Sequence, residues 1–342
     1  MKTILPQGLF IAILLLQTTG ILAGQSPVDA QTSVFEYLTQ EEASKLMLEI
    51  NLEKLLKNRK NGEYQKAVLT DASGRQFPVE VRTRGKFRRK RCEIPPVKLK
   101  FAKDSLLAFQ LDTMNEIKLV LPCTADPGSD ELIVREYVAY RMFEILSPEC
   151  SARARLIRLQ LKGKEKKRAQ KMLAMFVEHE EEISARQRCS IVKEWGVRPE
   201  QMNMDQVALM VLFQYMIGNM DWDISASRNV LLLQPHSDGK IIPVPFDFDF
   251  SGLVSAPYSS PSQESGMLTV RDRYLMADGI DTEALQRAKQ KILAAKQELY
   301  KWCRFNQLSS AASDDMTHFM DTFFDMLAKS DEIPAKLEIS KQ

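Results

Sequence analysis

Two acidic segments in the second half of the chain hold residue types that could do chemistry together. Asp221 and Asn229 lie in the stretch GNMDWDISASRNVLLL, and Asp247 and Asp249 lie in KIIPVPFDFDFSG. Residues two apart on a strand share one face, about 7 Å apart. Two carboxylates placed there among phenylalanines need a cation, or one must keep its proton. Because oxygen ligands suit Mg²⁺ or Mn²⁺, we predict a metal site with Asp247 and Asp249 as candidate ligands.

Three kinds of chemistry could use this pattern, and a plain alternative is that the carboxylates only cap and pair within turns. A calcium loop would begin D-x-D-x-S at Asp221, but Ala226 and Leu232 replace its usual Gly and Glu. A glycosidase would use Asp221 and Asp247 on either side of a sugar bond, yet no aromatic platform is visible. Phosphoryl transfer needs a base Asp, then an Asn ligand, then a metal-binding Asp after a hairpin, and this order is present.

Cationic side chains and one carboxylate of the first half could complete such a site. Lys98 and Lys100 alternate with apolar residues and so share one strand face, and Lys118 lies on the next expected strand. Glu136 lies on the apolar stripe of an expected helix, where a carboxylate is costly unless it is paired. Its partner could be one of these lysines, or instead Arg84 or another arginine. The two alternating lysines could equally face solvent.

Hydrophobic patterning predicts strands in the first half of the chain and helices in the second. Alternation predicts strands at 76–83, 97–101 and 156–161, and further strands are expected at 46–52, 117–121 and 172–177. Helical patterns cover 129–146, 204–217, 282–304 and 312–328. This order predicts an α+β protein of two lobes, with an N-terminal antiparallel sheet and one helix at 25–183 and a mainly helical C-terminal lobe at 184–342. A cleft between the lobes would be the place for a ligand.

Composition excludes several functional classes. The 342 residues are 44% hydrophobic and 27% charged, which is ordinary for a soluble globular protein and unlike a disordered or collagen-like chain. A net charge of +2 is too small an excess for a typical DNA- or RNA-binding protein, so no nucleic-acid partner is expected. Three scattered histidines argue against a His-based zinc site.

The first two dozen residues have the features of a targeting segment. Lys2 supplies a positive start, the apolar run LFIAILLL follows, and small residues end the segment. Because a spanning helix needs roughly 20 apolar residues, residues 1–24 are predicted to be a secretory signal peptide instead. The mature chain is then expected to be periplasmic or secreted, with no transmembrane helix. Export permits disulfides, but with five cysteines at least one thiol stays unpaired within the chain.

The ordered segments resemble kinases of the CotH type, a secreted protein-kinase-like family, and more distantly the HipA-type kinases. Those proteins carry a G-N-x-D loop, an Asn soon after it and a later metal-binding Asp. Residues 84–101 also match their R-G-x-F-R-R…C…P-P-x-K-L-K-F segment. The resemblance implies a two-lobed kinase-like fold that binds ATP with Mg²⁺ or Mn²⁺. It also implies transfer of the γ-phosphoryl group to a protein or glycan hydroxyl.

The resemblance implies a role for each candidate residue. Asp221 would be the base that positions the acceptor hydroxyl, Asn229 would hold metal, and Asp247 or Asp249 would be the later metal-binding aspartate. Cofactor-binding roles fall to four residues of the first half: Lys98, Lys100, Lys118 and Glu136. Two other functions stay open, a catalytically inactive kinase-like binding module of the cell envelope and a carbohydrate-active hydrolase.

Overall fold

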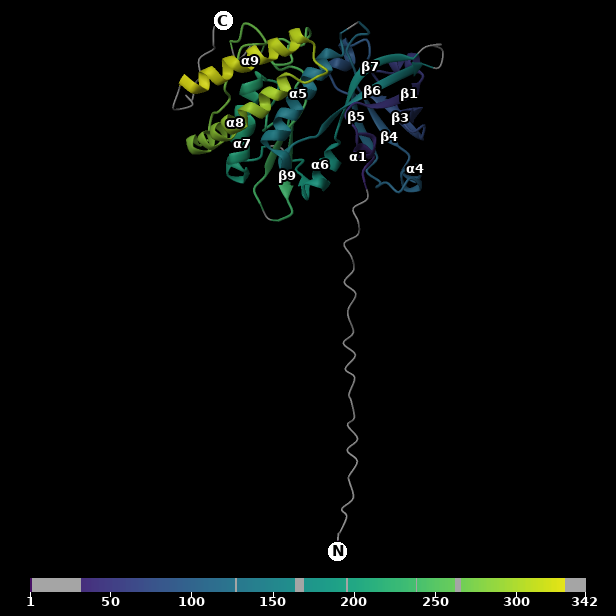
Figure 1. Cartoon of the computed structure of the whole chain (residues 1–342), viewed down its shortest axis with the longest axis horizontal. Coiled ribbons are helices and arrows are strands. Elements are labelled where there is room, and N and C mark those ends of the chain that lie inside the picture. Colours follow the sequence, from purple (N-terminus) through teal and green to yellow (C-terminus); the bar gives the residue numbers. More distant parts are fainter. Residues whose placement is uncertain are drawn as a thin grey trace. The chain divides into compact units, whose positions relative to one another are not determined.

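The first half of the chain forms a closed seven-stranded barrel, whose strands alternate apolar and polar residues (Figure 1). Its strands are β1 (Ser44–Ile50), β2 (Gln65–Thr70), β3 (Gln76–Thr83), β4 (Val97–Phe101), β5 (Glu116–Val120), β6 (Ala154–Gly163) and β7 (Gln170–Val177). They follow the order β1-β2-β3-β4-β5-β7-β6, and a parallel pairing of β1 with β6 closes the barrel. The predicted α+β class is confirmed. The expected antiparallel sheet is instead a closed barrel, because the two strands that close it lie far apart in the sequence and pair in parallel.

The computed structural model describes residue 1 and residues 32–126, 128–163, 169–194, 196–237, 239–261 and 266–329. The chain divides into two units, residues 1–31 and 32–342, and all helices and strands named below belong to the second. The predicted signal peptide, residues 1–24, lies outside the described residues except for Met1. Within the described ranges, no helix is both long enough and apolar enough to cross a bilayer.

Helices and a small sheet make up the rest of the fold. The long helices are α5 (Glu131–Leu146), α7 (Met204–Ile217), α8 (Thr282–Cys303) and α9 (Ser310–Lys329). Shorter helices are α1 (Val34–Leu38), α2 (Leu52–Lys57), α3 (Arg88–Arg91), α4 (Lys103–Ala108) and α6 (Glu180–Arg186), with 3₁₀ turns at Pro148–Cys150 and Pro199–Gln201. The small antiparallel sheet has the order β10-β9-β8, formed by β8 (Cys189–Ile191), β9 (Val230–Pro235) and β10 (Ile242–Pro245).

Two separate apolar clusters stabilise these parts. Inward side chains of the barrel strands form one cluster, which includes Phe77, Leu99 and Phe176. The other cluster joins α5, residues of β6 and β7, and the helices α7, α8 and α9. Helix α5 contacts both the barrel strands and α8, and Figure 1 shows it among the helices of the second half. Side chains of α5 can therefore reach both parts of the fold. The boundary expected after residue 183 stays a prediction.

One disulfide, Cys92–Cys123, joins the end of α3 to the segment that follows β5. The other three cysteines, Cys150, Cys189 and Cys303, are free thiols. The prediction that at least one thiol stays unpaired is therefore confirmed. Spacing alone left the pairing open, and the structure supplies it.

Candidate active site

The loop that carries Asp221 is held by the end of α7. This helix ends at Gly218, whose φ of 64° is left-handed, and a Cβ there would lie 3.1 Å from Phe319 Cζ. The next residue, Asn219, is buried and donates its side-chain N–H to Gln214 Oε1 at 3.0 Å. Its Oδ1 accepts the backbone N–H of Asp221 at 3.0 Å. The Gly-Asn pair therefore sets how the chain leaves the helix and so places Asp221.

Asn229 joins this loop to the open end of the β9–β10 hairpin. Its Nδ2 donates to the backbone oxygen of Asp221 at 2.6 Å and to Asp221 Oδ2 at 2.9 Å. Its backbone oxygen accepts the N–H of Phe246 at 3.0 Å, one residue before Asp247. Asn229 and Asp247 have left-handed φ values of 53° and 64°, which Asn and Asp adopt more readily than most residues. The structure thus brings together three predicted site residues from two segments.

Aromatic packing sets the direction of Asp247. Its backbone N–H donates to Tyr140 Oη of α5 at 2.8 Å. The ring of the next residue, the buried Phe248, packs 4.7 Å from the Tyr140 ring and 5.5 Å from the Phe213 ring, measured between centroids. The Asp247 carboxylate is half-buried and makes no hydrogen bond or ion pair to another described residue. The Asp247 carboxylate is therefore free to bind a cation.

The Asp221 carboxylate lies among charges of both signs. Burial raises its pKa, Arg228 with its Nε at 3.6 Å lowers it, and the charge of Asp247 raises it again. The neighbouring Asp223 does not join the site, because its Oδ1 accepts the hydroxyl of Ser225 at 2.7 Å within a turn. Capping within a turn, the plain alternative, thus applies to Asp223. The calcium-loop alternative loses support, since two of its would-be ligands bind each other.

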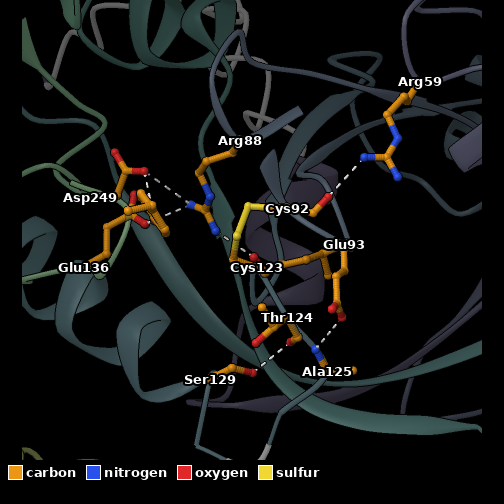
Figure 2. The surroundings of a disulfide bond; sticks show 12 residues. Arg59, Arg88, Cys92, Glu93, Cys123, Thr124, Ala125, Ser129, Glu136 and Asp249 are labelled. Atoms are coloured by element: carbon orange, nitrogen blue, oxygen red, sulfur yellow. Dashed lines mark hydrogen bonds and ion pairs between the residues drawn. A yellow bond between two sulfur atoms is a disulfide. The ribbon is translucent and has the colours of Figure 1, made fainter. Parts of the chain in front are cut away.

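Asp249 belongs to a different, buried cluster, which Figure 2 shows around a single arginine. Arg88 Nη1 lies 3.4 Å from Glu136 Oε2 and 3.8 Å from Asp249 Oδ2, and the Tyr258 hydroxyl donates to Asp249 Oδ2 at 3.0 Å. Of the partners that the sequence left open for Glu136, the structure has an arginine and not a lysine. Burial raises the pKa of both carboxyls, nearby aspartates raise it further, and Arg88 lowers it. Asp249 thus lies 3.8 Å from a protein cation, whereas Asp247 forms no such ion pair with another described residue.

Lys118 on β5 is the lysine that the structure brings next to the Phe246–Asp247 segment. It is buried, and its Nζ lies 2.5 Å from Glu180 Oε1 and 4.9 Å from the centre of the Phe246 ring. Burial lowers the pKa of Lys118, Glu180 raises it, and the charge of Arg84 lowers it. Burial alone would raise the pKa of Glu180, but Lys118 outweighs it and brings that pKa to about 2. The Glu180 carboxyl is therefore ionised at neutral pH.

The other two candidate lysines lie farther along the same barrel wall. Lys98 is opposite Lys118 on β4, and its Nζ pairs with Glu116 Oε2 at 2.8 Å and contacts His179 Nε2 at 3.0 Å. Lys100 Nζ lies 5.7 Å from the centre of the Tyr64 ring. Lys98 is thus close to the Lys118 pair, while the contact of Lys100 is with the Tyr64 ring.

Glu182 of α6 should make the stability of the fold depend on pH. Its buried carboxylate accepts the hydroxyl of Ser33; burial raises its pKa to about 7, against an ordinary value of 4.5. Because the folded state holds this proton more tightly, the stabilising contribution is complete below pH 4.5 and is lost as pH rises through 7. We expect Glu182→Gln to be more stable than the wild type at pH 8.5, by about 1–3 kcal/mol, but not at pH 4.5.

Urea unfolding at the two pH values checks this expectation. Glu181→Gln is the matched control, because Glu181 is the exposed neighbour on the same helix and should change the free energy of unfolding little at either pH. An equal effect of Glu182→Gln at pH 4.5 and pH 8.5 would contradict the assignment.

Sequence analysis singled out none of four side chains that lie in or beside the site: Arg88, Tyr140, Glu180 and Tyr258. Arg88 lies within the basic run 86–91, which fits either a phosphate-binding or a solvated turn, and no local pattern marks it as the buried member. Tyr140 follows Glu136 by four residues and so shares its helix face, which is a signal that could have found it. Glu180 and Lys118 are far apart in the sequence, so no local pattern could have indicated their contact.

The oxygens at the hairpin end are of the type that a small divalent cation prefers. The described residues contain no group of three or more His, Cys, Asp or Glu side chains that could hold a metal. Mg²⁺ does not need one, since it keeps several waters and is usually held by one or two carboxylates plus substrate phosphates. Asn229 uses its Nδ2 on Asp221, and its Oδ1 has no donor among the described side chains and backbone. That oxygen and the Asp247 carboxylate are the candidate ligands.

A solved kinase structure is weakly similar in fold to this chain. It is the crystal structure of a Helicobacter pylori proinflammatory kinase, CtkA, with 10% sequence identity and a TM-score of 0.39, covering 72% of this chain and 91% of that one. The sequence matches no family model and no curated protein. Because so low a similarity carries no functional conclusion, the function has to come from the geometry of the site.

Proposed function

We propose that this protein is an ATP-dependent phosphotransferase with a two-lobed, protein-kinase-like arrangement, which transfers the γ-phosphoryl group to a hydroxyl of a protein or glycan. The observation that carries the proposal is the meeting of Asp221, Asn229 and Asp247 at one hairpin end, within reach of the charge of Lys118. Along the chain, Lys118, Glu136, Asp221, Asn229 and Asp247 also follow the order of the corresponding parts of protein kinases.

Asp247 and the Oδ1 of Asn229 would hold Mg²⁺ or Mn²⁺. When bound, such an ion bridges phosphate oxygens and offsets the charge that develops on them. Asp247 supports this role better than Asp249, because Arg88 and Tyr258 already occupy the Asp249 carboxylate. The left-handed backbone of both proposed ligands agrees with the tendency of strained residues to gather at active sites.

Basic residues on the barrel side would hold the phosphates of ATP. Arg84 directly follows β3, and its charge acts on both Lys118 and Glu136. It also begins the connection between β3 and β4, which carries the basic run 86–91. In protein kinases a loop covers the phosphates while a strand lysine contacts them. We therefore assign the phosphate contacts to Arg84 and Lys118.

Asp221 would act on the acceptor. Its carboxylate would accept the proton of the attacking hydroxyl, as the catalytic-loop aspartate of protein kinases does. The bond from Asn229 orients the carboxylate. Burial raises the pKa of Asp221, which makes it a stronger base, and the half-exposed Arg228 beside it opposes that rise. The side chain of Asp221 keeps 39% of its surface exposed, so an acceptor can reach it.

Export to the periplasm or beyond is part of the proposal. The Cys92–Cys123 disulfide supports it, because disulfides persist in oxidising compartments and are rare in reducing ones. The two other functions considered from the sequence become outcomes of the test. No contact in the described part of the chain specifically favours a carbohydrate-active hydrolase, and an inactive binding module would bind nucleotide without transferring phosphate.

The test is incubation of the purified, oxidised protein with ATP radiolabelled at the γ-phosphate, with Mg²⁺ or Mn²⁺ and a mixture of protein and glycan acceptors. We expect ATP with metal to raise the thermal unfolding midpoint and label to appear on an acceptor or on the protein itself. A rise in midpoint without label or ATP hydrolysis would identify an inactive module. Absence of both effects would refute the proposal.

Replacing Lys118 should weaken ATP binding more than replacing either other lysine. Lys118→Met removes a buried cation next to Asp247, and we expect about a 10- to 100-fold loss of affinity for metal–ATP, the worth of one or two charged hydrogen bonds. Lys100→Met is the matched control, because Lys100 contacts Tyr64 and should change affinity less than about threefold. Titration calorimetry measures both. A larger loss for Lys100→Met would move the phosphate contact to β4.

A further inference from the structure

Arg88 is a buried arginine that connects four parts of the fold (Figure 2). It belongs to α3, and its side chain is only 8% exposed. Its Nη1 faces Glu136 of α5 and Asp249 of the segment after β10, and its Nη2 donates to the backbone oxygen of Leu121 at 2.7 Å. The guanidinium carbon lies 5.8 Å from the centre of the Tyr258 ring. One cation thus serves two carboxylates that would otherwise repel each other.

The disulfide holds α3 at the place where Arg88 makes these contacts. Cys92 follows α3 directly, and its N–H donates to the backbone oxygen of Arg88 at 2.9 Å. On the other side of the S–S bond, Cys123 lies two residues after Leu121, the carbonyl partner of Arg88. The backbone oxygen of Cys123 also accepts the N–H of Glu93 at 2.8 Å. The disulfide and the Glu93 hydrogen bond therefore fix the C-terminal end of α3, just after Arg88, to the segment that follows β5.

From these contacts we infer that Arg88 is a positioning residue for the Asp247–Asp249 segment and that the Cys92–Cys123 disulfide keeps it in place. Asp249 is two residues from Asp247, and Phe248 between them is clamped by aromatic rings. Holding Asp249 in place therefore also holds the backbone of Asp247 and so the direction of its carboxylate. Without Arg88, two buried carboxyls would face each other with no cation, so one of them would have to keep a proton or the segment would have to move.

The inference rests on the proposed function in one respect, that Asp247 is the metal ligand. It differs from a simple stabilising role in what it predicts. A purely structural ion pair would lower the unfolding midpoint and leave the affinity of the folded protein for metal unchanged. A positioning residue lowers that affinity even when the protein is fully folded, typically about 10- to 100-fold for partners that orient a ligand.

The experiment compares three changes in the full mature chain: Arg88→Met, Arg88→Lys, and the double change Cys92→Ser with Cys123→Ser. Cys150→Ser is the matched control, because Cys150 is a free thiol away from the cluster. Two readouts are taken under conditions where each protein is folded: Mn²⁺ affinity in the presence of ATP by electron paramagnetic resonance, and backbone hydrogen exchange of residues 246–258.

Arg88→Met should lose about 10- to 100-fold in Mn²⁺ affinity and exchange about tenfold faster across residues 246–258. Arg88→Lys should recover part of both, since a cation without the planar fork satisfies one carboxylate better than two. The double cysteine change should move both readouts in the same direction by a smaller factor, and Cys150→Ser should move neither. If Arg88→Met fails to fold, Arg88→Lys and the double cysteine change still decide the matter.

The two proposals fail in different ways. If the wild type does not bind Mn²⁺ with ATP, the proposed function is refuted, while the exchange of residues 246–258 still reports whether Arg88 and the disulfide hold the segment. If the wild type binds metal and neither readout moves in the Arg88 or double cysteine variants, the positioning role is refuted and the proposed function stands.

Discussion

Asp221→Asn is expected to reduce phosphoryl transfer by about 10²–10⁴-fold, the range that a positioned general base contributes. The affinity for metal–ATP should stay within about threefold of the wild type. The reason is geometric: Asp221 is held by Asn219 and Asn229 and keeps 39% of its side chain exposed. The proposed phosphate contacts come instead from Lys118 on β5 and from Arg84 just after β3. Asparagine keeps the shape and can still bond to Asn229, but it cannot take a proton.

Steady-state transfer rates and calorimetric ATP titration together check this expectation. Asp223→Asn is the matched control, because Asp223 lies two residues away, has the same side chain and bonds only within its own turn. We expect that change to leave the transfer rate within about threefold of the wild type. If the two variants transfer phosphate equally well, Asp221 is not the base, and the acceptor must be activated elsewhere.

Local sequence patterns predict much of the secondary structure for a physical reason. The strands at 76–83 and 97–101 and the helix at 204–217 are confirmed with the predicted bounds. The two strands bury every second side chain, and the helix is apolar on nearly all sides, so each pattern is visible in the local sequence. The strand β2 has the burial alternation of its partners, yet its sequence QKAVLT is short and mixed, and the sequence analysis did not include it. The barrel itself depends on the pairing of β1 with β6, which no local pattern can encode.

In the candidate site, too, residues close in the sequence could be predicted to meet, and residues far apart could not. Asp221, Asn229 and Asp247 could be predicted to meet because a hairpin returns the chain to its starting point, so that residues flanking β9 and β10 become neighbours. Arg88 could not be predicted, since its partners Glu136 and Asp249 come from elements far away in the sequence. The preference for Asp247 over Asp249 also needed the structure, because Arg88 and Tyr258 contact the Asp249 carboxylate and not that of Asp247.

That difference makes Asp247→Asn the sharpest test of the metal site. Asparagine retains one oxygen ligand but loses the charge that a divalent cation requires. We expect the metal-dependent part of ATP binding to fall by more than about a hundredfold, beyond the 10- to 100-fold that outer partners usually contribute. The fold should persist, because the backbone bond to Tyr140 and the packing of Phe248 do not involve the carboxylate. Mn²⁺ titration in the presence of ATP measures the loss, and circular dichroism confirms folding.

Asp249→Asn is the matched comparison, since it changes the same side chain two residues away. Asparagine there would leave Arg88 paired with Glu136 alone and would keep an acceptor for the Tyr258 hydroxyl. The segment would lose part of its anchor but no metal ligand, so Mn²⁺ affinity should fall by only about tenfold. If Asp249→Asn instead produces the larger loss, Arg88 must release Asp249 when metal binds, and the ligand assignment passes from the first aspartate to the second.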